Sequence, residues 1–316
     1  MYYGILDIGS NSVRLVIYDK KKNKISAIFN EKRSVGQADE LQRGFLSEEG
    51  CQLLVDTIDQ FCNIAQVFRV DHLLPFATAY WLEVENHVQV MERIKKQLGL
   101  AVDIMNAKDE ARYEYVGVEA SGFLTVKSSS ILDISSLSSR IINCHKREYQ
   151  ESITLPFGSL SLSNQFVRQI PPTKEELEAI CAFVRLRMME SHVQPLEKKN
   201  VLVGVGSTAR MIARIDRVRK GVKDPSHTYH LTPKALGDIY DSAMNNPPQA
   251  QQQFGRVSSS RTRMILPGIM AFYHMSSFLQ PKKIIISRFG VREGYLISKL
   301  EQEYGERFQM VPPEVL

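Results

Sequence analysis

Apolar, β-branched residues open the chain in two short runs that a polar turn separates. The runs are residues 2–8 and 13–18, and glycine, serine and asparagine make up the turn. This pattern predicts a β-hairpin, and residues 25–30 predict a third strand of the same meander. One carboxylate, Asp7, stands at the end of the first strand. The turn offers hydroxyl, amide and backbone N–H donors of the kind that surround a phosphate oxygen, although an ordinary polar turn has the same composition.

Helical spacing follows the meander and alternates with strands. Leu54, Ile58 and Phe61 recur at the spacing of a helix that starts at Ser47. The further elements expected up to residue 121 are a strand at 73–78, a helix at 83–98, a strand at 101–105 and a helix at 107–118. Alternation of strands and helices predicts an α/β protein. The last helix is highly charged, which fits either an exposed helix with i,i+4 charge pairs or a helix whose Glu110 and Glu114 face a site.

A second copy of the opening hairpin begins near the middle of the chain. Residues 132–142 repeat the order of residues 6–16: Leu-Asp-Ile, a small-residue turn, an arginine and an apolar run. Asp133 thus corresponds to Asp7 and Arg140 to Arg14. This self-similarity predicts two halves of related architecture, each presenting a hairpin to a shared cleft.

The rest of the second half also reads as helices and strands. Two prolines and Thr173 before a Glu-Glu pair predict a helix that runs to about residue 192. The strand expected at 200–205 leads into Gly206-Ser207-Thr208 and a helix. This arrangement points backbone N–H groups at an anion, although tight turns use glycine regardless. The remaining elements are a break at 247–253 that fits a loop or a helix start, a helix at 261–279, a strand at 283–287 and a helix at 291–304.

Composition narrows the class of protein only modestly. A length of 316 residues suggests about two domains, and 43% hydrophobic residues suffice for two cores. The net charge of +5 favours an anionic partner, although a merely soluble surface fits it as well, and no block of basic residues marks a nucleic-acid arm. The four cysteines show no C-x-x-C spacing, and no signal peptide or bilayer-spanning run is evident. We therefore expect a cytoplasmic protein with no membrane and no specific nucleic-acid partner.

Four motifs together resemble one family. They are the opening Asp-Ile-Gly-Ser-Asn-Ser-Val-Arg, the Asp-Glu-Ala around Glu110, the turn at 206–208 and the segment 287–294. In this order they resemble the exopolyphosphatase/guanosine pentaphosphate phosphatase (Ppx/GppA) family over essentially the whole chain. The resemblance implies an actin-like ATPase fold with two ribonuclease-H-like lobes around a cleft. It implies Mg²⁺-dependent or Mn²⁺-dependent removal of terminal phosphate from polyphosphate or from pppGpp. The lobes expected are 1–121 with a C-terminal helix at about 300–316, and 122–299.

The resemblance also implies roles for single residues. Glu110 matches the family's catalytic base, Asp133 the aspartate of the second phosphate motif, and Asp7 that of the first. Asp133 is therefore expected to act in catalysis, and both aspartates to position metal or water. The phosphate-binding residues implied by position are Ser10, Asn11, Ser12, Arg14, Gly206, Ser207 and Thr208.

Several positions depart from the family pattern. Ser135, Ser136 and Leu137 replace three glycines of the second motif, and their Cβ atoms are expected to crowd that turn. Arg140 replaces a glutamate and Arg263 an aspartate. If both arginines face the cleft, they bind phosphate oxygens and disfavour Mg²⁺; the alternative is that both lie on the surface.

These departures leave several functions open. One is a phosphoanhydride hydrolase, weakened by the loss of the glycine-rich motif. Another is a binding protein that senses polyphosphate or (p)ppGpp without turnover. A sugar or acid kinase on the same scaffold is less well supported, because its ATP site needs the lost glycines. A homodimer stays open, and so does the choice between polyphosphate and pppGpp.

Overall fold

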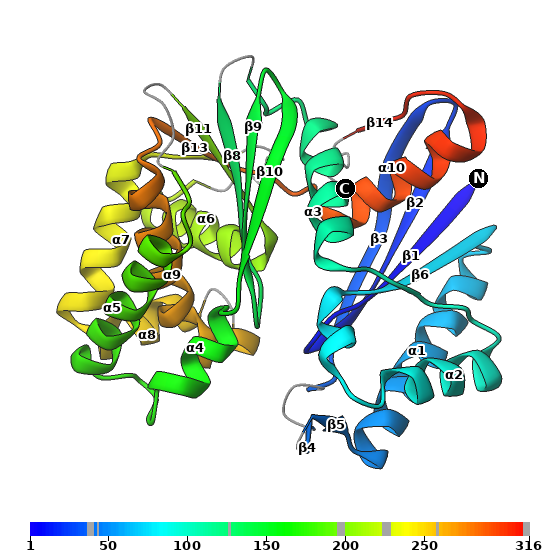
Figure 1. The fold of residues 1–316 in the computed structure, drawn as a ribbon, viewed down its shortest axis with the longest axis horizontal. Helices are drawn as coiled ribbons and strands as arrows, with labels where there is room; N and C mark the ends of the chain where they lie inside the picture. The colour runs from blue at the N-terminus through cyan, green and yellow to red at the C-terminus, as the bar shows by residue number, and fades with distance from the viewer. Residues whose placement is uncertain are drawn as a thin grey trace. The chain divides into compact units, whose positions relative to one another are not determined.

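Two six-stranded sheets with flanking helices make up the protein (Figure 1). The computed structural model describes residues 1–36, 41–42, 44–125, 128–194, 200–222, 229–256 and 259–311. Contacts group the chain into unit 1, Met1–Ala120 with Val291–Leu316, and unit 2, Ser121–Gly290. Each unit has its own sheet, so the predicted α/β class is confirmed. In the described residues, no helix is long and apolar enough to cross a membrane.

Unit 1 is built on a sheet with the order β14-β3-β2-β1-β6-β7. Strands β1 to β3 form the predicted antiparallel meander, whereas β6 runs parallel to β1, and β7 parallel to β6. The strands of this sheet are β1 (Tyr2–Ile8), β2 (Ser12–Lys21), β3 (Lys24–Ser34), β6 (His72–Ala77), β7 (Asp103–Ile104) and β14 (Gln309–Met310). Strands β4 (Leu41–Gln42) and β5 (Phe45–Leu46) pair in a separate two-stranded sheet. The helices of unit 1 are α1 (Glu48–Val67), η1 (Ala79–Glu83), α2 (His87–Leu98), α3 (Ala107–Glu119) and α10 (Val291–Tyr304).

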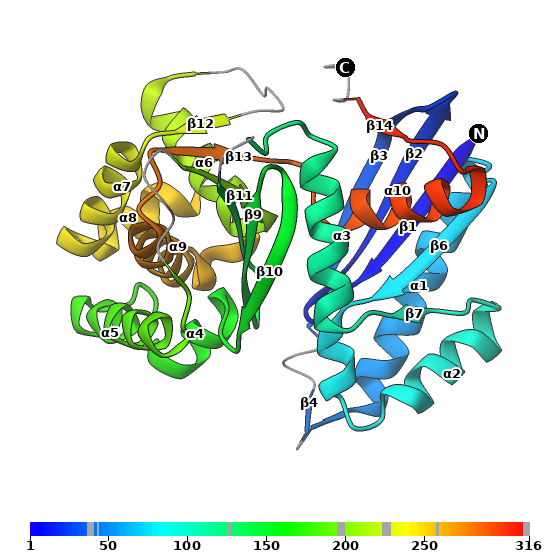
Figure 2. The same cartoon turned by 45° about the horizontal axis from the view of Figure 1, so that its top comes forward.

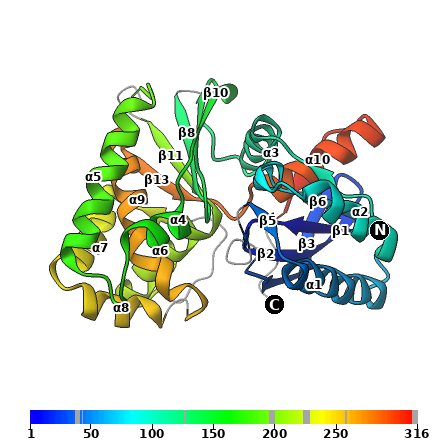
Figure 3. The same ribbon diagram turned by 60° about the horizontal axis from the view of Figure 1, so that its bottom comes forward.

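Strand β1 divides its side chains between two layers of helices. Leu6 and Ile8 belong to the apolar core with α1, because alternate residues of a strand point to the same face. Tyr3 and Asp7 point to the opposite face, where both contact side chains of α10. Figure 3 shows α1 on one side of the unit 1 sheet, with α3 and α10 on the other. The alternation of the first strand therefore directs Asp7 towards α10.

Unit 2 repeats this plan with the sheet order β10-β9-β8-β11-β13-β12. Strands β8 to β10 are an antiparallel meander, and β11 and β13 run parallel to β8. Its strands are β8 (Ser129–Ile134), β9 (Ser139–His145), β10 (Glu148–Leu155), β11 (Val201–Val205), β12 (Tyr229–Leu231) and β13 (Lys283–Ile286). Its helices are α4 (Ser159–Phe166), α5 (Lys174–Glu190), α6 (Gly206–Lys220), α7 (Pro233–Asn245), α8 (Pro247–Gly255), η2 (Ser259–Met264) and α9 (Ile265–Leu279).

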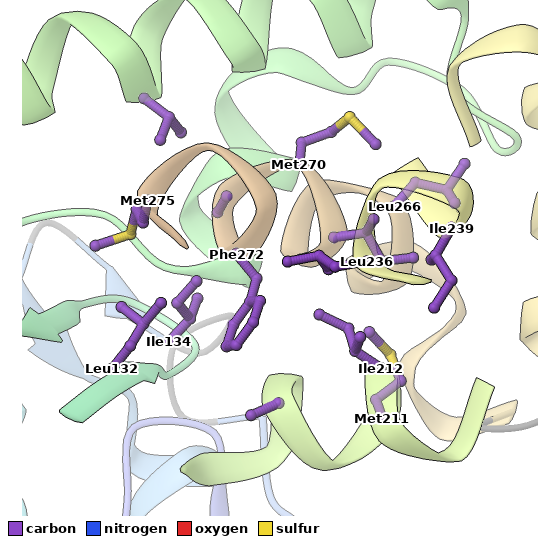
Figure 4. Close-up of a cluster of buried hydrophobic side chains, with 14 of the residues drawn as sticks. Leu132, Ile134, Met211, Ile212, Leu236, Ile239, Leu266, Met270, Phe272 and Met275 are labelled. Atoms are coloured by element: carbon purple, nitrogen blue, oxygen red, sulfur yellow. The ribbon is translucent and has the colours of Figure 1, made fainter. Parts of the chain in front are cut away.

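The core of unit 2 forms around α9. Leu132 and Ile134 of β8 belong to one cluster with Phe272 of α9 and Ile212 of α6. Figure 4 shows the Phe272 ring between the ribbons of α9 and α6. Because α9 is apolar on nearly all sides, it is enclosed by other helices, as expected of a helix without a polar face.

The internal repeat predicted from the sequence has a direct structural counterpart. In β1–β2, Asp7 lies opposite Arg14, and in β8–β9, Asp133 lies opposite Arg140. The turns also share one hydrogen bond: Gly9 N–H donates to the Ser12 carbonyl at 3.0 Å, as Ser135 N–H does to the Ser138 carbonyl at 2.9 Å. The two hairpins therefore have the same register.

Some predicted elements differ from the observed ones. The helix expected at 83–98 begins only at His87, because residues 79–83 form a separate 3-10 turn. Likewise, α9 begins at Ile265 after η2 rather than at residue 261. Strand β14 was missed, since two residues carry no period. The break at 247 is a helix start, where Asn246 caps α8.

The C-terminal region differs most from the expected lobes. The helix expected at about 300–316 ends at Tyr304, and residues 312–316 lie outside the described residues. Residues 291–299 group with unit 1 rather than with unit 2, because α10 is one continuous helix that packs on α3 (Figure 2).

Candidate functional site

The turn after β1 presents polar groups at the end of the unit 1 sheet. The Asn11 carbonyl accepts hydrogen bonds from the N–H groups of Val35 and Gly36, which fixes the turn against the end of β3. The side chains of Ser10, Asn11 and Ser12 are partly exposed, and none has a hydrogen-bond partner in the described part of the chain. The turn can therefore offer these donors to a ligand.

Asp7 lies beside this turn and forms an ion pair that the sequence did not reveal. Arg292 Nη1 on α10 lies 2.6 Å from Asp7 Oδ2. Although burial opposes its charged form, the carboxylates of Asp7 and Glu293 raise the pKa of Arg292. Arg14, the cross-strand neighbour of Asp7, instead donates from Nη1 to Asn30 Oδ1 at 2.6 Å. The side chain of Asp7 is therefore tied to α10.

A second buried contact supports this pair. The Tyr18 hydroxyl donates to Glu293 Oε1 at 2.6 Å. Burial and the Glu293 carboxylate raise the pKa of Tyr18 well above its ordinary value. Asp7 on β1 binds Arg292 and Tyr18 on β2 binds Glu293, so adjacent strands hold neighbouring residues of α10.

Glu110 is fixed in the first turn of α3. Asn106 and Asp109 form a capping box that starts this helix. Glu110 Oε1 accepts a hydrogen bond from Ala79 N–H at 3.0 Å, and the residue is 8% exposed. Glu114 is 1% exposed, so the interpretation of α3 as an exposed charged helix is wrong.

The packing of α3 on α10 explains this burial. A Cβ atom on Gly294 would lie 1.7 Å from the Tyr113 carbonyl oxygen and 2.8 Å from Gly117 N. Only glycine at position 294 allows the two helices to approach so closely. The helix that carries Glu110 and the helix that holds Asp7 therefore form one packed layer.

In unit 2, Asp133 lies against the start of α6. A Cβ atom on Gly206 would lie 1.8 Å from Asp133 Oδ1, and Gly206 has a φ of +75°. Both observations require glycine at this position. Arg140, opposite Asp133 on β9, is 5% exposed. Side chains directly opposite in an antiparallel pair lie on one face, so the arginine and the carboxylate are neighbours.

The turn at 135–138 accepts its serines without strain. No residue of the turn has a positive φ, so the backbone of this turn does not itself require glycine. The carbonyls of Ser135 and Ser136 accept hydrogen bonds from Ser159 N–H at 2.9 Å and Leu160 N–H at 2.8 Å, at the start of α4. A Cβ atom on Gly158 would lie 2.5 Å from the Ser136 carbonyl carbon. The close backbone approach that requires glycine is therefore made by Gly158.

The remaining candidate residues of unit 2 have different surroundings. The Thr208 hydroxyl donates to the Ile134 carbonyl at 2.8 Å, and the residue is 1% exposed, so its side chain ties α6 to β8. Ser207 is partly exposed at the second position of α6. The side chain of Arg263 is exposed, and its carbonyl accepts a hydrogen bond from the Ser163 hydroxyl at 3.1 Å. Arg140 and Arg263 thus do not share one environment.

The acidic residues do not gather into a metal centre within either unit. Among the described residues, no three histidine, cysteine or acidic side chains lie close enough to hold an ion. Asp7 Oδ2 is already paired with a cation, and Asp133 belongs to the other unit. Within either unit, the described residues thus give no complete donor set for a divalent metal, and we derive no step through one.

Sequence reasoning missed Arg292 and Glu293 as residues around Asp7. The motif at 287–294 was noticed, but it gave no partner for either side chain. Pairing across nearly the whole chain leaves no local period, so only the fold brings these residues together.

Comparisons with known proteins place these features in a family. The model of the Ppx/GppA phosphatase family matches residues 16–303. Exopolyphosphatase 1 of Mycobacterium tuberculosis is 23% identical over 307 residues, covering 96% of this chain and 89% of the relative. Its counterpart from Mycobacterium leprae is 24% identical over 309 residues, covering 96% and 91%.

Solved structures agree on the fold. The Ppx/GppA family member of Aquifex aeolicus superimposes with a TM-score of 0.81 and 26% identity, covering 96% of this chain and 99% of the other. An exopolyphosphatase from Cytophaga hutchinsonii has a TM-score of 0.82 at 19% identity, covering 96% and 98%. The fold is thus the two-lobed, actin-like ATPase fold. The chain belongs to the Ppx/GppA phosphatase family.

Proposed function

We propose that this chain is a phosphoanhydride hydrolase that releases terminal phosphate from inorganic polyphosphate or from pppGpp. The observation that carries the proposal is the tether of Glu110 to the turn after β1. Thr78 N–H donates to the Ile8 carbonyl at 3.1 Å, and the next N–H, that of Ala79, holds Glu110 Oε1 at 3.0 Å. A general base and a group of phosphate-binding donors are thereby fixed to one strand end.

Each group has a defined task in this proposal. The hydroxyl and amide groups of Ser10, Asn11 and Ser12, with backbone N–H groups of the turn, bind the oxygens of the terminal phosphate. Glu110 orients a water molecule towards the terminal phosphorus and accepts its proton as the new P–O bond forms. The bridging P–O bond of the anhydride breaks in the same step, and the shortened chain or nucleotide leaves with the bridging oxygen. In unit 2, the start of α6 at Gly206 and Ser207 offers further N–H donors. The names of the mycobacterial relatives support polyphosphate as the substrate.

Further parts of the proposal rest on the family and composition alone. Mg²⁺ or Mn²⁺ would neutralise phosphate oxygens when bound, and Asp7 and Asp133 are the residues that the resemblance assigns to it. The four free cysteines favour a reducing compartment, so we place the protein in the cytoplasm. Homodimer formation and pppGpp hydrolysis are also part of the proposal, and they likewise rest on the family and the composition.

A second candidate function is anion binding without turnover. The observation that favours it is Arg140, which is 5% exposed and lies opposite Asp133. A guanidinium at this place binds phosphate oxygens and competes with a metal ion. The protein would then sense polyphosphate or (p)ppGpp.

The test compares phosphate release from polyphosphate, pppGpp and ATP, with Mg²⁺, with Mn²⁺ and with chelator. The Glu110→Gln variant is expected to lower kcat by about 100-fold or more, because it removes the general base. Glu119→Gln, an exposed glutamate on the same helix, is the matched control and is expected to retain activity.

The outcome separates the two functions. Unchanged kcat in Glu110→Gln contradicts the hydrolase mechanism. Saturable binding of polyphosphate or pppGpp without phosphate release supports the sensor, provided that Arg140→Gln weakens the binding. Binding that is unaffected by Arg140→Gln excludes the role given to that arginine.

A further inference from the structure

Three arginines form a row on helix α6 of unit 2. Arg210, Arg214 and Arg217 are spaced at i, i+4 and i+7, so they lie on one side of the helix. The opposite side of α6 packs into the core through residues such as Ile212. The row therefore faces away from the core of its unit.

The carboxylate of Asp216, the acidic residue of α6, does not neutralise the positive charge of this row. Asp216 is 3% exposed. Its Oδ2 accepts hydrogen bonds from the Tyr229 hydroxyl and from Lys220 Nζ, each at 2.6 Å. The charge of Asp216 is thus balanced on the inner side of the helix.

Helix α6 carries the row along the carboxyl ends of the strands. It begins where Gly206 touches Asp133, and Thr208 bonds to the last residue of β8. It ends beside Tyr229, which pairs with the last residue of β13. Figure 2 shows α6 beside β11, β12 and β13. An extended anion that is bound at the start of α6 therefore lies next to the first arginine of the row.

A fourth arginine extends the row beyond the helix. Arg288 follows β13 and is exposed, and it has no ion pair or hydrogen bond within the described part of the chain. Partial burial and the nearby Arg217 charge lower the pKa of Arg288. The guanidinium groups of Arg217 and Arg288 therefore repel one another, and an anion bound to both relieves the repulsion.

We propose that Arg210, Arg214, Arg217 and Arg288 form an extended subsite on unit 2 for the inner phosphates of a linear polyphosphate chain. This inference rests on the proposed function and selects polyphosphate over pppGpp. From Arg210 to Arg217 the helix rises by about 10 Å, so the row reaches several phosphate units in succession. The short phosphate groups of a nucleotide reach only its beginning.

The chemistry of the row favours polyphosphate over single-stranded nucleic acid. Nucleic acid needs exposed aromatic faces on which bases stack. The aromatic ring at the row is that of Tyr229, which Arg217 covers at 5.4 Å and whose hydroxyl is bonded to Asp216. Among the described residues, the row thus offers cations for phosphate and no free aromatic face for a base.

The test measures binding of tripolyphosphate and of long-chain polyphosphate by calorimetry at several salt concentrations. The triple variant Arg210→Gln/Arg214→Gln/Arg217→Gln is expected to lose about tenfold or more in affinity for the long chain, and to show a shallower salt dependence. Its affinity for tripolyphosphate is expected to change by about twofold at most. Arg288→Gln is expected to act in the same direction with a smaller loss.

Arg219→Gln is the matched control, because Arg219 is exposed on the same helix but lies on the opposite side from the row. An equal loss for Arg219→Gln and for Arg217→Gln would mean that net charge alone acts, which overturns the subsite. So would a triple variant that binds long chains as before, or single-stranded DNA that displaces long-chain polyphosphate. The assay needs no turnover, so the subsite can stand if hydrolysis fails. Conversely, if the triple variant hydrolyses polyphosphate with an unaltered preference for chain length, the proposed function is retained and the arginine subsite is rejected.

Discussion

Arg292 Nη1 lies 2.6 Å from Asp7 Oδ2, although 285 positions separate the two residues in the chain. The pair joins the first strand to the last long helix. Both side chains of the pair are largely buried, with 16% of the Asp7 side chain and 18% of the Arg292 side chain exposed. We therefore regard Arg292 as a positioning residue for the end of β1.

Replacing Arg292 by methionine is expected to lower the free energy of unfolding by about 3 kcal/mol, because it leaves the carboxylates of Asp7 and Glu293 without their cation. Urea unfolding measures this loss. Lys299→Met removes the more exposed pair of α10 with Asp103, and it is expected to cost less than about 1 kcal/mol. Equal effects of the two variants would contradict the structural importance of the Asp7 pair.

Gly294→Ala is expected to destabilise the protein by about 3 kcal/mol, because its Cβ would overlap the Tyr113 carbonyl and force α3 away from α10. Thermal unfolding and circular dichroism measure the effect. The matched control is Gly237→Ala in α7, where nothing lies within 4 Å of the new Cβ. That change is expected to be neutral or slightly stabilising. A stable Gly294→Ala protein would mean that the two helices pack less closely than described.

Thr208→Val is expected to lower stability by about 1–2 kcal/mol and to leave the affinity for polyphosphate unchanged. The hydroxyl donates to the buried Ile134 carbonyl, which loses its partner in the variant. Thr208→Ser keeps the donor and serves as the control. A large loss of polyphosphate affinity in Thr208→Val at unchanged stability would mean that this hydroxyl binds the ligand.

His274 is expected to make the free energy of unfolding fall as the pH decreases below neutrality. Its ring packs edge-on to Tyr240 and Tyr273, and Nε2 has no hydrogen-bond partner in the described part of the chain. Burial, helped by the charge of Arg185, lowers the pKa of His274 to about 4. The folded state therefore keeps the ring neutral at pH values where the unfolded chain already binds a proton.

The sign follows from this difference. Stability from the neutral ring is fully present above about pH 6.5, and it is lost as the pH falls from there towards 4, by about 2 kcal/mol for a partly exposed group. Urea unfolding at pH 7 and pH 4.5 measures the loss, which His274→Gln is expected to reduce. His145→Gln changes an exposed histidine and is expected to leave the pH dependence as it is. An unchanged pH profile in His274→Gln would reject the assignment.

Local patterns predicted the parts of the fold that depend on near neighbours. The capping box of Thr173 and Glu176 starts α5 where the sequence placed it, and the β1–β2 hairpin has the expected turn. The matching register of Asp7–Arg14 and Asp133–Arg140 was readable because the repeat preserves side-chain type and spacing. Short edge strands such as β14 could not be predicted from local patterns, since they depend on a partner strand that is distant in sequence.

The candidate site was less predictable, because its side chains depend on contacts between distant elements. The sequence identified Asp7 and Glu110 by resemblance. It could not reveal that Asp7 is held by Arg292, or that Glu110 is held by the backbone of Ala79. It also located the need for glycine in the wrong segment: the turn at 135–138 tolerates its serines because Gly158, 20 positions later, allows α4 to approach.

Unit 1 is interrupted in the chain, since unit 2 is inserted between α3 and α10. On the ribosome, the first 120 residues therefore emerge without the helix that contains Arg292 and Gly294. All of unit 2 is synthesised before that helix appears. Until then, Asp7 lacks its cation, Tyr18 lacks its acceptor and one face of α3 lacks its cover. Unit 2 can thus complete its core during synthesis, whereas unit 1 becomes complete only when nearly the whole chain has been made.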